Sequence, residues 1–317
     1  MRNLLLLASL CCLLTCCRDT PPKQIPKRTV SDVSLVVLGN VQDAGAPHIA
    51  CKKDCCRELF DNPDPKRQVT SLGLIDRISG KTYLFEASPD LPRQTKMLKT
   101  IADVDEELPD GIFLTHAHIG HYAGLMYLGK EATNAKQVPV YAMPRMRSFL
   151  TNDGPWSQLV SNNNIALQQL TADSTILLTP QLQVTPFQVP HRDEFSETVG
   201  YLISGPHQKA LFIPDIDKWE KWDRQIEDLI AEVDYAFLDG TFYDAAELNT
   251  RDISQIPHPF VSESMRRFAP LSRDEKDKIN FLHFNHTNKL LVPGSKEISE
   301  VFRQGFRVAY FGDQFGL

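Results

Sequence analysis

The stretch "IFLTHAHIGHYAGL" (residues 112–125) sets the interpretation of this chain, because it crowds histidines directly after an apolar run. His116, His118 and His121 have the spacing H-x-H-x-x-H. One buried histidine is usually a packing residue, but three together at the end of an expected strand are typical of a metal site, since neutral imidazole is a common metal ligand. The stretch therefore predicts a metal centre whose other ligands lie elsewhere in the chain.

Ligand-type side chains also follow other apolar segments. His191 comes after "FQVP", Asp215 after "ALFIP", and His283 and His286 after "INFL". Strand ends on one side of a sheet are where convergent sites form, because strands fix positions and loops carry the chemistry. A strand-end aspartate can also cap a helix. The ordered series of histidines, aspartate and histidines is more specific than any one member.

The hydrophobic pattern alternates strands and helices, which predicts one α/β domain with mixed strands. Two segments, 71–77 and 81–87, read as a hairpin around "ISGK". Trp219, Trp222, Ile226 and Ile230 recur at helical intervals and predict an amphipathic helix with both tryptophans in the core. The other expected strands are 33–40, 111–115, 138–142, 181–189, 198–204, 209–215, 233–240, 278–284 and 306–311, and the other expected helical segments are 121–132, 144–150 and 295–304.

Composition limits the class of partner. The 317 residues are 42% hydrophobic and 23% charged, which suits a globular protein with a large core. The formal net charge of −6 excludes a basic field that would recruit nucleic acid non-specifically. A nucleic-acid substrate would have to be held locally, at the site itself. The partners expected here are a small-molecule substrate and no nucleic acid.

The N-terminus "MRNLLLLASLCCLLTCC" has an early arginine and an apolar run too short to span a bilayer, as in secretory signals. Its end resembles the lipobox of bacterial lipoproteins and predicts lipidation of Cys16, with Cys17 as the alternative. A plain cleaved signal or an uncleaved anchor would also fit. The predicted organisation is a signal peptide over 1–16, a Pro-rich tether over 17–31 and a domain over 32–317. A bacterial protein anchored in the cell envelope by lipid is the expected localisation.

A second cluster of ligand-type residues lies in "PHIACKKDCC", which contains His48, Cys51, Cys55 and Cys56. Three thiolates and one imidazole are a good tetrahedral set for structural zinc. A disulfide from Cys51 to either of the other two is sterically possible in an oxidising compartment, and free thiols are the third possibility. Structural zinc is the interpretation preferred here.

The order of the histidines and the aspartate resembles the metallo-β-lactamase superfamily. The resemblance implies a four-layer αββα sandwich with one or two metal ions at the strand ends. It also implies a first metal site at His116, His118 and His191, a bridging Asp215, and a second site at His121 and His286. The usual motif is H-x-H-x-D-H, and Gly120 stands here at the acidic position. Since glycine offers no ligand, the second site is expected to be weaker.

Within that superfamily, the stretches "VVLGNVQDAGAPHIACKKDCC", "EASPDLPRQ" and "HFNHTN" resemble the pyrroloquinoline quinone biosynthesis protein B family. The resemblance runs from about residue 33 to the C-terminus. That family carries a cysteine cluster in the same place, commonly C-x-C-x-x-C, whereas the spacing here is C-x-x-x-C-C. The family also has an altered metal motif.

Imidazole and carboxylate ligands favour zinc, with iron or manganese as alternatives. The leading prediction is a metal-dependent hydrolase acting on an ester, phosphodiester or similar bond. Asp215, His258 and His283 are the candidate catalytic residues, and Ser88 and Asp90 the candidate substrate-binding residues. Two alternatives remain: a mononuclear-iron oxidative enzyme of quinone cofactor biosynthesis, which the family resemblance implies, and a non-catalytic binding or carrier protein.

Overall fold

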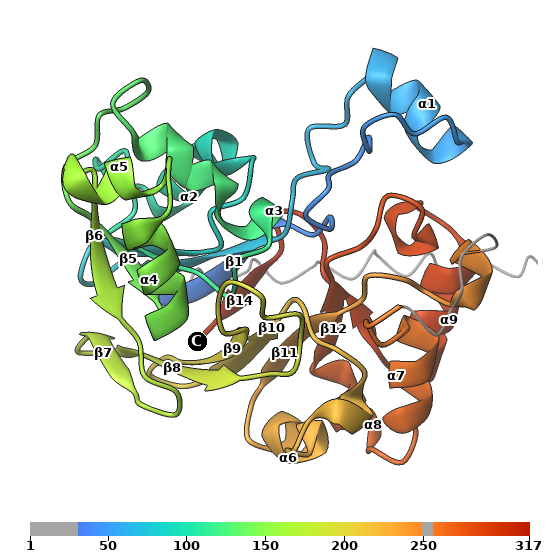
Figure 1. Ribbon diagram of the computed structural model, residues 1–317. Coiled ribbons are helices and arrows are strands. Elements are labelled where there is room, and N and C mark those ends of the chain that lie inside the picture. Colours follow the sequence, from blue (N-terminus) through green and yellow to red (C-terminus); the bar gives the residue numbers. More distant parts are fainter. Residues whose placement is uncertain (1–30, 249–255) are drawn as a thin grey trace, which may run out of the picture. The chain divides into compact units, whose positions relative to one another are not determined.

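Two mixed sheets stack face to face in the computed structural model, which describes residues 31–248 and 256–317 (Figure 1). The predicted signal peptide, the lipidation site Cys16 and nearly all of the predicted tether lie outside the described residues. Residues Ser31–Leu317 form one unit by their internal contacts.

The first sheet has the strand order β14-β1-β2-β3-β4-β5-β6. Its β14-to-β3 half is antiparallel and its β3-to-β6 half is parallel. All residues of β1 and β2 are buried, which explains their almost unbroken apolar sequences. The strands are β1 (Val33–Gly39), β2 (Ser71–Asp76), β3 (Lys81–Phe85), β4 (Gly111–Phe113), β5 (Val138–Ala142), β6 (Ile165–Gln169) and β14 (Gln314–Gly316).

The second sheet repeats this arrangement in the order β13-β12-β11-β10-β9-β8-β7. The pairs from β7 to β10 are antiparallel, and the pairs from β10 to β13 are parallel. The strands are β7 (Ile176–Thr179), β8 (Leu182–Gln188), β9 (Val199–Ser204), β10 (Lys209–Ile213), β11 (Tyr235–Asp239), β12 (Ile279–Leu282) and β13 (Arg307–Val308).

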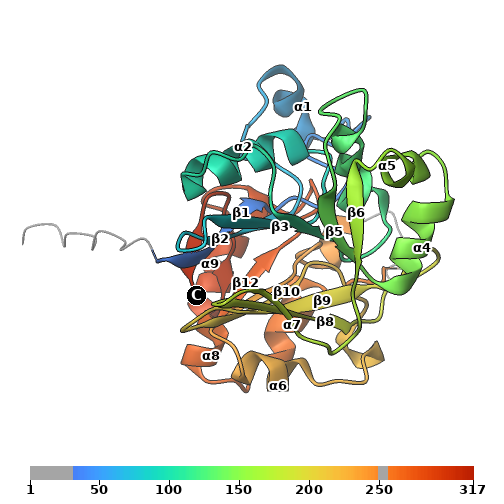
Figure 2. The ribbon, with the colours of Figure 1, turned by 90° about the vertical axis from the view of Figure 1, so that its left-hand side faces the viewer.

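Helices cover the outer face of each sheet, with α2 above the first sheet and α6 and α8 below the second in Figure 2. Three apolar clusters separate the resulting layers: one between the sheets, containing Phe85 and Phe212, and one beneath each helical layer. The four-layer αββα sandwich is therefore confirmed. The helices are α1 (Asp54–Asp61), α2 (Leu91–Ala102), α3 (Ile119–Tyr122), α4 (Pro144–Asn152), α5 (Ser157–Ser161), α6 (Ile226–Ala231), α7 (Val261–Arg267), α8 (Arg273–Asp277) and α9 (Lys296–Gln304), with 3₁₀ turns at Ala123–Leu128, Trp219–Lys221, Ala245–Leu248 and Lys289–Leu291.

Three expected elements differ from the structure. The single helix through Trp219 and Ile230 is wrong: a 3₁₀ turn at Trp219–Lys221 is followed by extended backbone at Trp222, and α6 begins only at Ile226. Both tryptophans are nevertheless core residues, as expected. The expected helix 121–132 is short and continues as a 3₁₀ turn. The final strand 306–311 contains only Arg307–Val308, and β14 follows it in the other sheet.

Candidate metal centre

The predicted ligands converge because most of them follow strands of the two sheets that end on the same side. His116 lies three residues after β4, Asp215 two residues after β10, and His283 directly after β12. The carboxyl ends of the parallel strands meet there, which is the usual position for a site in such sheets. His191 reaches the same place three residues after β8.

A first group of donor atoms comes from His116, His118, His191 and Asp215, the set predicted for the first metal. The atoms lie within 4.8 Å of one another. Nε2 of His116 is 2.8 Å from Nδ1 of His118 and 3.4 Å from Oδ2 of Asp215. Nε2 of His191 lies 3.2 Å from Oδ1 of Asp215. The structure therefore brings all four together.

A second group consists of Asp43, His121 and His283, again with donor atoms within 4.8 Å of one another. This differs from two predictions, because His286 was expected beside His121, and His283 was expected to position substrate or pass a proton. His283 directly follows β12 and belongs to this group, whereas His286 lies farther along the loop. Asp43 was missed, since "NVQDAG" matches no metal motif.

Asp215 lies between the two groups. Its Oδ2 is 3.6 Å from Nε2 of His121 and 4.0 Å from Nε2 of His283. Its Oδ1 is also 3.1 Å from Nδ1 of His258, which contacts Oδ2 of Asp239 at 2.8 Å. Asp239, at the end of β11, was also missed, because a strand-end aspartate carries no motif of its own.

Outer contacts orient the ligand rings. Nδ1 of His191 lies 3.1 Å from Oδ1 of Asp217, and Nδ1 of His283 lies 2.9 Å from Oγ1 of Thr241. The second nitrogen of a metal-bound histidine commonly makes such a contact, which fixes the tautomer and leaves the other nitrogen for metal. In both rings Nε2 is the nitrogen near Asp215.

The centre concentrates negative charge in the interior. Glu86, Asp215 and Asp239 are buried, and their ion-pair contacts in the described part of the chain reach histidines only. Burial favours the neutral form of His121, but the carboxylates of Glu86 and Asp215 outweigh it and raise the pKa of His121. Burial lowers the pKa of His283 to about 4. Buried anions of this kind require compensation, which a cation supplies.

Buried polar atoms without hydrogen-bond partners test whether metal would fit. Among the described residues they include Nε2 of His121, His191 and His283 and Oδ1 of Asp215. Buried polar atoms are normally paired, so each unpaired one needs an explanation. These four atoms lie beside one another and are all metal-ligand types, so the residues fit one or two transition-metal ions.

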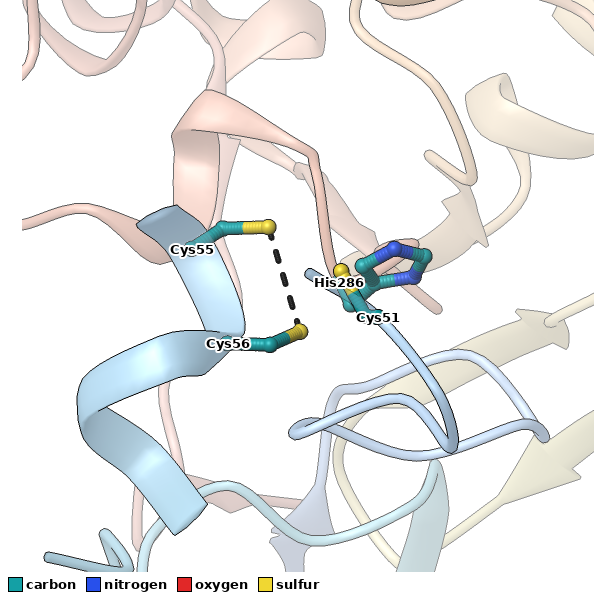
Figure 3. Close-up of side chains that lie close together, drawn as sticks. All are labelled: Cys51, Cys55, Cys56 and His286. Atoms are coloured by element: carbon teal, nitrogen blue, oxygen red, sulfur yellow. Dashed lines mark hydrogen bonds between the residues drawn. The ribbon is translucent and has the colours of Figure 1, made fainter. Parts of the chain in front are cut away.

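The cysteine cluster forms a separate group of Cys51, Cys55, Cys56 and His286, drawn in Figure 3. The predicted fourth ligand His48 is corrected: its ring packs on that of His286, with centroids 4.5 Å apart, and its backbone N–H donates to Sγ of Cys56. The three described cysteines are free of disulfides. Burial lowers the pKa of His286 to about 4, which leaves a neutral imidazole suited to metal.

Comparison with known proteins identifies the family. The model of the "Beta-lactamase superfamily domain" matches residues 81–283, more than half of the chain. The chain belongs to the β-lactamase superfamily. Its fold is the metallo-β-lactamase fold, and its resemblance to the pyrroloquinoline quinone branch extends over nearly the whole chain.

The relatives in that branch include the coenzyme PQQ synthesis protein B of Methylorubrum extorquens strain PA1, 23% identical over 303 residues that cover 88% of this chain and 98% of the relative. Zn²⁺-bound PqqB from Methylobacterium extorquens has a similar structure, with a TM-score of 0.74, 22% identity and coverage of 90% and 100%. A diphosphatase of the PhnP family gives a TM-score of 0.59 at 20% identity, covering 89% and 96%. At these identities the structures show a shared fold.

The predicted localisation is wrong. An exported protein anchored in the bacterial cell envelope was expected from the apolar N-terminus, but the relatives that match most of the chain are named for the synthesis of coenzyme PQQ and not for a role at the envelope. Within residues 31–248 and 256–317, no helix is long and apolar enough to cross a membrane. An apolar N-terminal run alone was insufficient evidence for the location.

Ser88 and Asp90, the two predicted substrate-binding residues, make hydrogen bonds within the fold. Ser88 is fully buried and donates to Oε1 of Gln94 at 2.8 Å. Oδ2 of Asp90 accepts from the backbone N–H of Val69 at 2.8 Å, at the start of α2. These contacts tie α2 to the first sheet. They do not support the predicted role in binding substrate.

A pocket of ≈ 400 Å³ opens beside the candidate metal centre. Its walls include His258 from the metal centre and His286 from the cysteine cluster, so it lies between the two. Lys53 and Arg192 also line it. Its volume suits a small molecule.

Proposed function

We propose that this chain is a metal-dependent hydrolase that uses two ions at the strand-end centre. The observation that carries the proposal is the position of Asp215 between two groups of ligand-type side chains. One carboxylate oxygen lies 3.2 Å from Nε2 of His191, and the other lies 3.6 Å from Nε2 of His121. A carboxylate placed in this way can bridge two ions, as in two-metal hydrolytic sites.

The residues divide the work of binding and positioning. His116, His118 and His191 would hold the first ion, and His121 and His283 would help to hold the second. When bound, divalent metal lowers the pKa of its water to about 7 and polarises a phosphoryl or carbonyl oxygen. Asp217 and Thr241 would keep the rings of His191 and His283 in the tautomers that leave Nε2 for metal.

His258 is the proposed proton donor to the leaving group. Its Nδ1 is held by Asp239 at 2.8 Å, which leaves Nε2 as the nitrogen available to a substrate. The side chain lines the pocket and also touches Asp215, so a bound substrate would lie within its reach. A histidine oriented by a buried carboxylate is a common general acid.

The pocket favours a small anionic substrate. Lys53 and Arg192 line it together with His258, so a phosphate or carboxylate group could bind cations there while the scissile bond faces the metal centre. The volume of ≈ 400 Å³ suits a small-molecule substrate.

A metal is proposed at the cysteine cluster as well. Cys51, Cys55, Cys56 and His286 match a tetrahedral zinc set in type and number. Burial beside the other two thiols raises the pKa of Cys55 to about 12, so a cation is needed to stabilise its thiolate. Such an ion would stabilise the fold.

A second candidate function is oxidation at a single iron ion, as in a step of quinone cofactor synthesis. The observation that favours it is the match to coenzyme PQQ synthesis protein B over 88% of this chain. It would use the first group of ligands alone and an aromatic or amino-acid substrate with oxygen. Neutral imidazoles with one carboxylate and open positions suit non-haem iron.

One experiment separates these functions. Protein purified without added metal is analysed for metal content and assayed with phosphodiester, ester and lactam substrates, and for oxygen consumption with aromatic amino acids. Two zinc ions at the histidines with hydrolytic turnover are the expected result. One iron ion with oxygen consumption would favour the oxidative function, and an empty histidine centre would leave only a binding or carrier role.

A further inference from the structure

Gly120 stands at the position where the metal motif has an aspartate, and Asp43 lies in the space next to it. Gly120 lies in α3, between His118 and His121. A Cβ atom added to Gly120 would lie 2.2 Å from Cβ of Asp43 and 2.6 Å from its carbonyl oxygen. Non-bonded atoms do not approach so closely, so a side chain at 120 and Asp43 in its present place exclude each other. The glycine permits a close backbone approach and has no left-handed φ.

The loop that carries Asp43 is fixed against the end of β12. The backbone N–H of Gln42 donates to the carbonyl of Phe284 at 2.8 Å, and the N–H of Phe284 donates to Asn40 at 2.8 Å. Val41 and Phe284 form a parallel bridge. Since Phe284 follows His283 directly, these bonds set the distance between Asp43 and His283.

The donor atoms of Asp43 complete a set with two buried imidazoles. A carboxylate oxygen of Asp43 and one nitrogen each of His121 and His283 lie within 4.8 Å of one another. Both nitrogens of His121 and Nε2 of His283 have no hydrogen-bond partner among the described residues.

We infer that Asp43 is the carboxylate ligand of the second ion and replaces the aspartate that the motif places at position 120. This inference rests on the proposed two-ion centre. It corrects the expectation that Gly120 weakens the second site, because the site has Asp43, His121 and His283 with a share of Asp215. Gly120→Asp would therefore introduce a clash with Asp43 and would not supply a missing ligand.

The test is a zinc titration of the full-length protein, with bound ions counted by elemental analysis and the Kd of each measured by chelator competition. The wild type is expected to hold two ions at the histidine centre. Asp43→Asn keeps the shape but removes the charge, and should weaken the second ion at least about 10-fold with the first unchanged. Asp54→Asn is the matched control, because its side chain is 89% exposed on the same segment, and it should change neither ion.

A second pair of variants keeps the inference testable if Asp43→Asn fails to fold. Asp43→Glu keeps a carboxylate on the same loop and leaves Gly120 unchanged, so it should bind the second ion more tightly than Asp43→Ala. Gly120→Asp should lose stability without gaining metal, because its Cβ would meet the backbone carbonyl of Asp43 at 2.6 Å. A folded Asp43→Asn protein with an unchanged Kd for the second ion, or Asp43→Glu and Asp43→Ala proteins that bind this ion equally, would overturn the inference. A wild type with no ion at the histidines would instead overturn the proposed function.

Discussion

The first and second groups of ligands in the metal centre lie on different kinds of segment. His116, His191 and Asp215 lie two or three residues beyond strands, so the sheets fix their positions. Asp43 comes from a loop that is held to the end of β12 by backbone hydrogen bonds beside Val41 and Phe284. The first group can be read from local sequence. The second depends on contacts between segments about 240 residues apart.

This difference implies different tolerance to change. A strand-end ligand stays in place while its sheet is folded, because the buried ladder holds it. A loop ligand such as Asp43 also depends on whatever orders the loop, and the same segment runs on to the cysteine cluster. We therefore expect the first ion to be robust and the second to depend on remote residues.

The largest effect on activity is expected from removing ligands of the first group. His116→Ala and Asp215→Ala should each lose metal and lower kcat/KM by more than about 100-fold, because the ligands and the activated water act as one unit. Asp215→Ala should release both ions, whereas His116→Ala should release mainly the first. Elemental analysis and the substrate assay measure both effects on one preparation.

His207→Ala is the control for these variants, since His207 is exposed and outside every group of ligand-type residues in the described part of the chain. It should keep full metal content and rate. Activity and metal retained in His116→Ala would contradict the assignment of "THAHIGH" to the catalytic centre.

Local patterns predicted one domain of mixed strands and helices and the candidate ligands at strand ends, whereas the four-layer sandwich was implied by the resemblance to the metallo-β-lactamase superfamily. The hairpin of β2 and β3 and the order of His116, His118, His191 and Asp215 follow from apolar runs and spacing. The exchange of His283 and His286 could not be predicted, because both follow the same strand and only the folded loop shows which faces the centre.

Other misses have the same physical origin. Asp43 and Asp239 are single acidic residues near strand ends, where helix caps and turns also use aspartate. Only their contacts with His121, His283 and His258 distinguish them. The expected helix is broken at Trp222, where tertiary contacts hold the side chain: Nε1–H donates to the carbonyl of Gln188, and the ring stacks on Phe187.

The next prediction tests whether the cysteine cluster stabilises the second group of ligands, Asp43, His121 and His283. Cys56→Ser should lose one ion, lower thermal stability and weaken the second ion at the histidines, because Asp43 and His283 lie on the two segments that the cluster joins. The first ion should be unchanged. Equal weakening of both ions in a calorimetric titration would show that the effect is global unfolding and not a difference between the groups.

A smaller effect is expected at the outer contact of His191. Asp217→Asn should weaken the first ion by about 10- to 100-fold, because Asp217 orients the ring through Nδ1 at 3.1 Å. The second ion should bind as in the wild type. Asp223→Asn is the matched control, since Asp223 is exposed on the same loop. If both variants weaken the first ion equally, the cause is surface charge and not orientation.

The smallest effect concerns Glu247, which lines the pocket between the two regions. Burial raises the pKa of Glu247 from 4.5 to about 7. Between these values the folded chain holds a proton that the unfolded chain has lost, so the free energy of unfolding falls as pH rises through this window. Glu247→Gln should therefore be more stable than the wild type at pH 8, by about 3 kcal/mol, and equal to it at pH 4.

Chemical denaturation at the two pH values measures this difference. A stability gain that is the same at pH 4 and pH 8 would contradict a proton-linked effect. A constant gain would arise from packing, which does not change with pH.

The central claim is that metal occupies the strand-end centre on both sides of Asp215. Its most direct test is anomalous diffraction at the zinc, iron and manganese edges, from crystals of protein purified without added metal. The account predicts one peak among His116, His118 and His191, and a second among Asp43, His121 and His283. Anomalous density only at the cysteine cluster, with none beside Asp215, would contradict it.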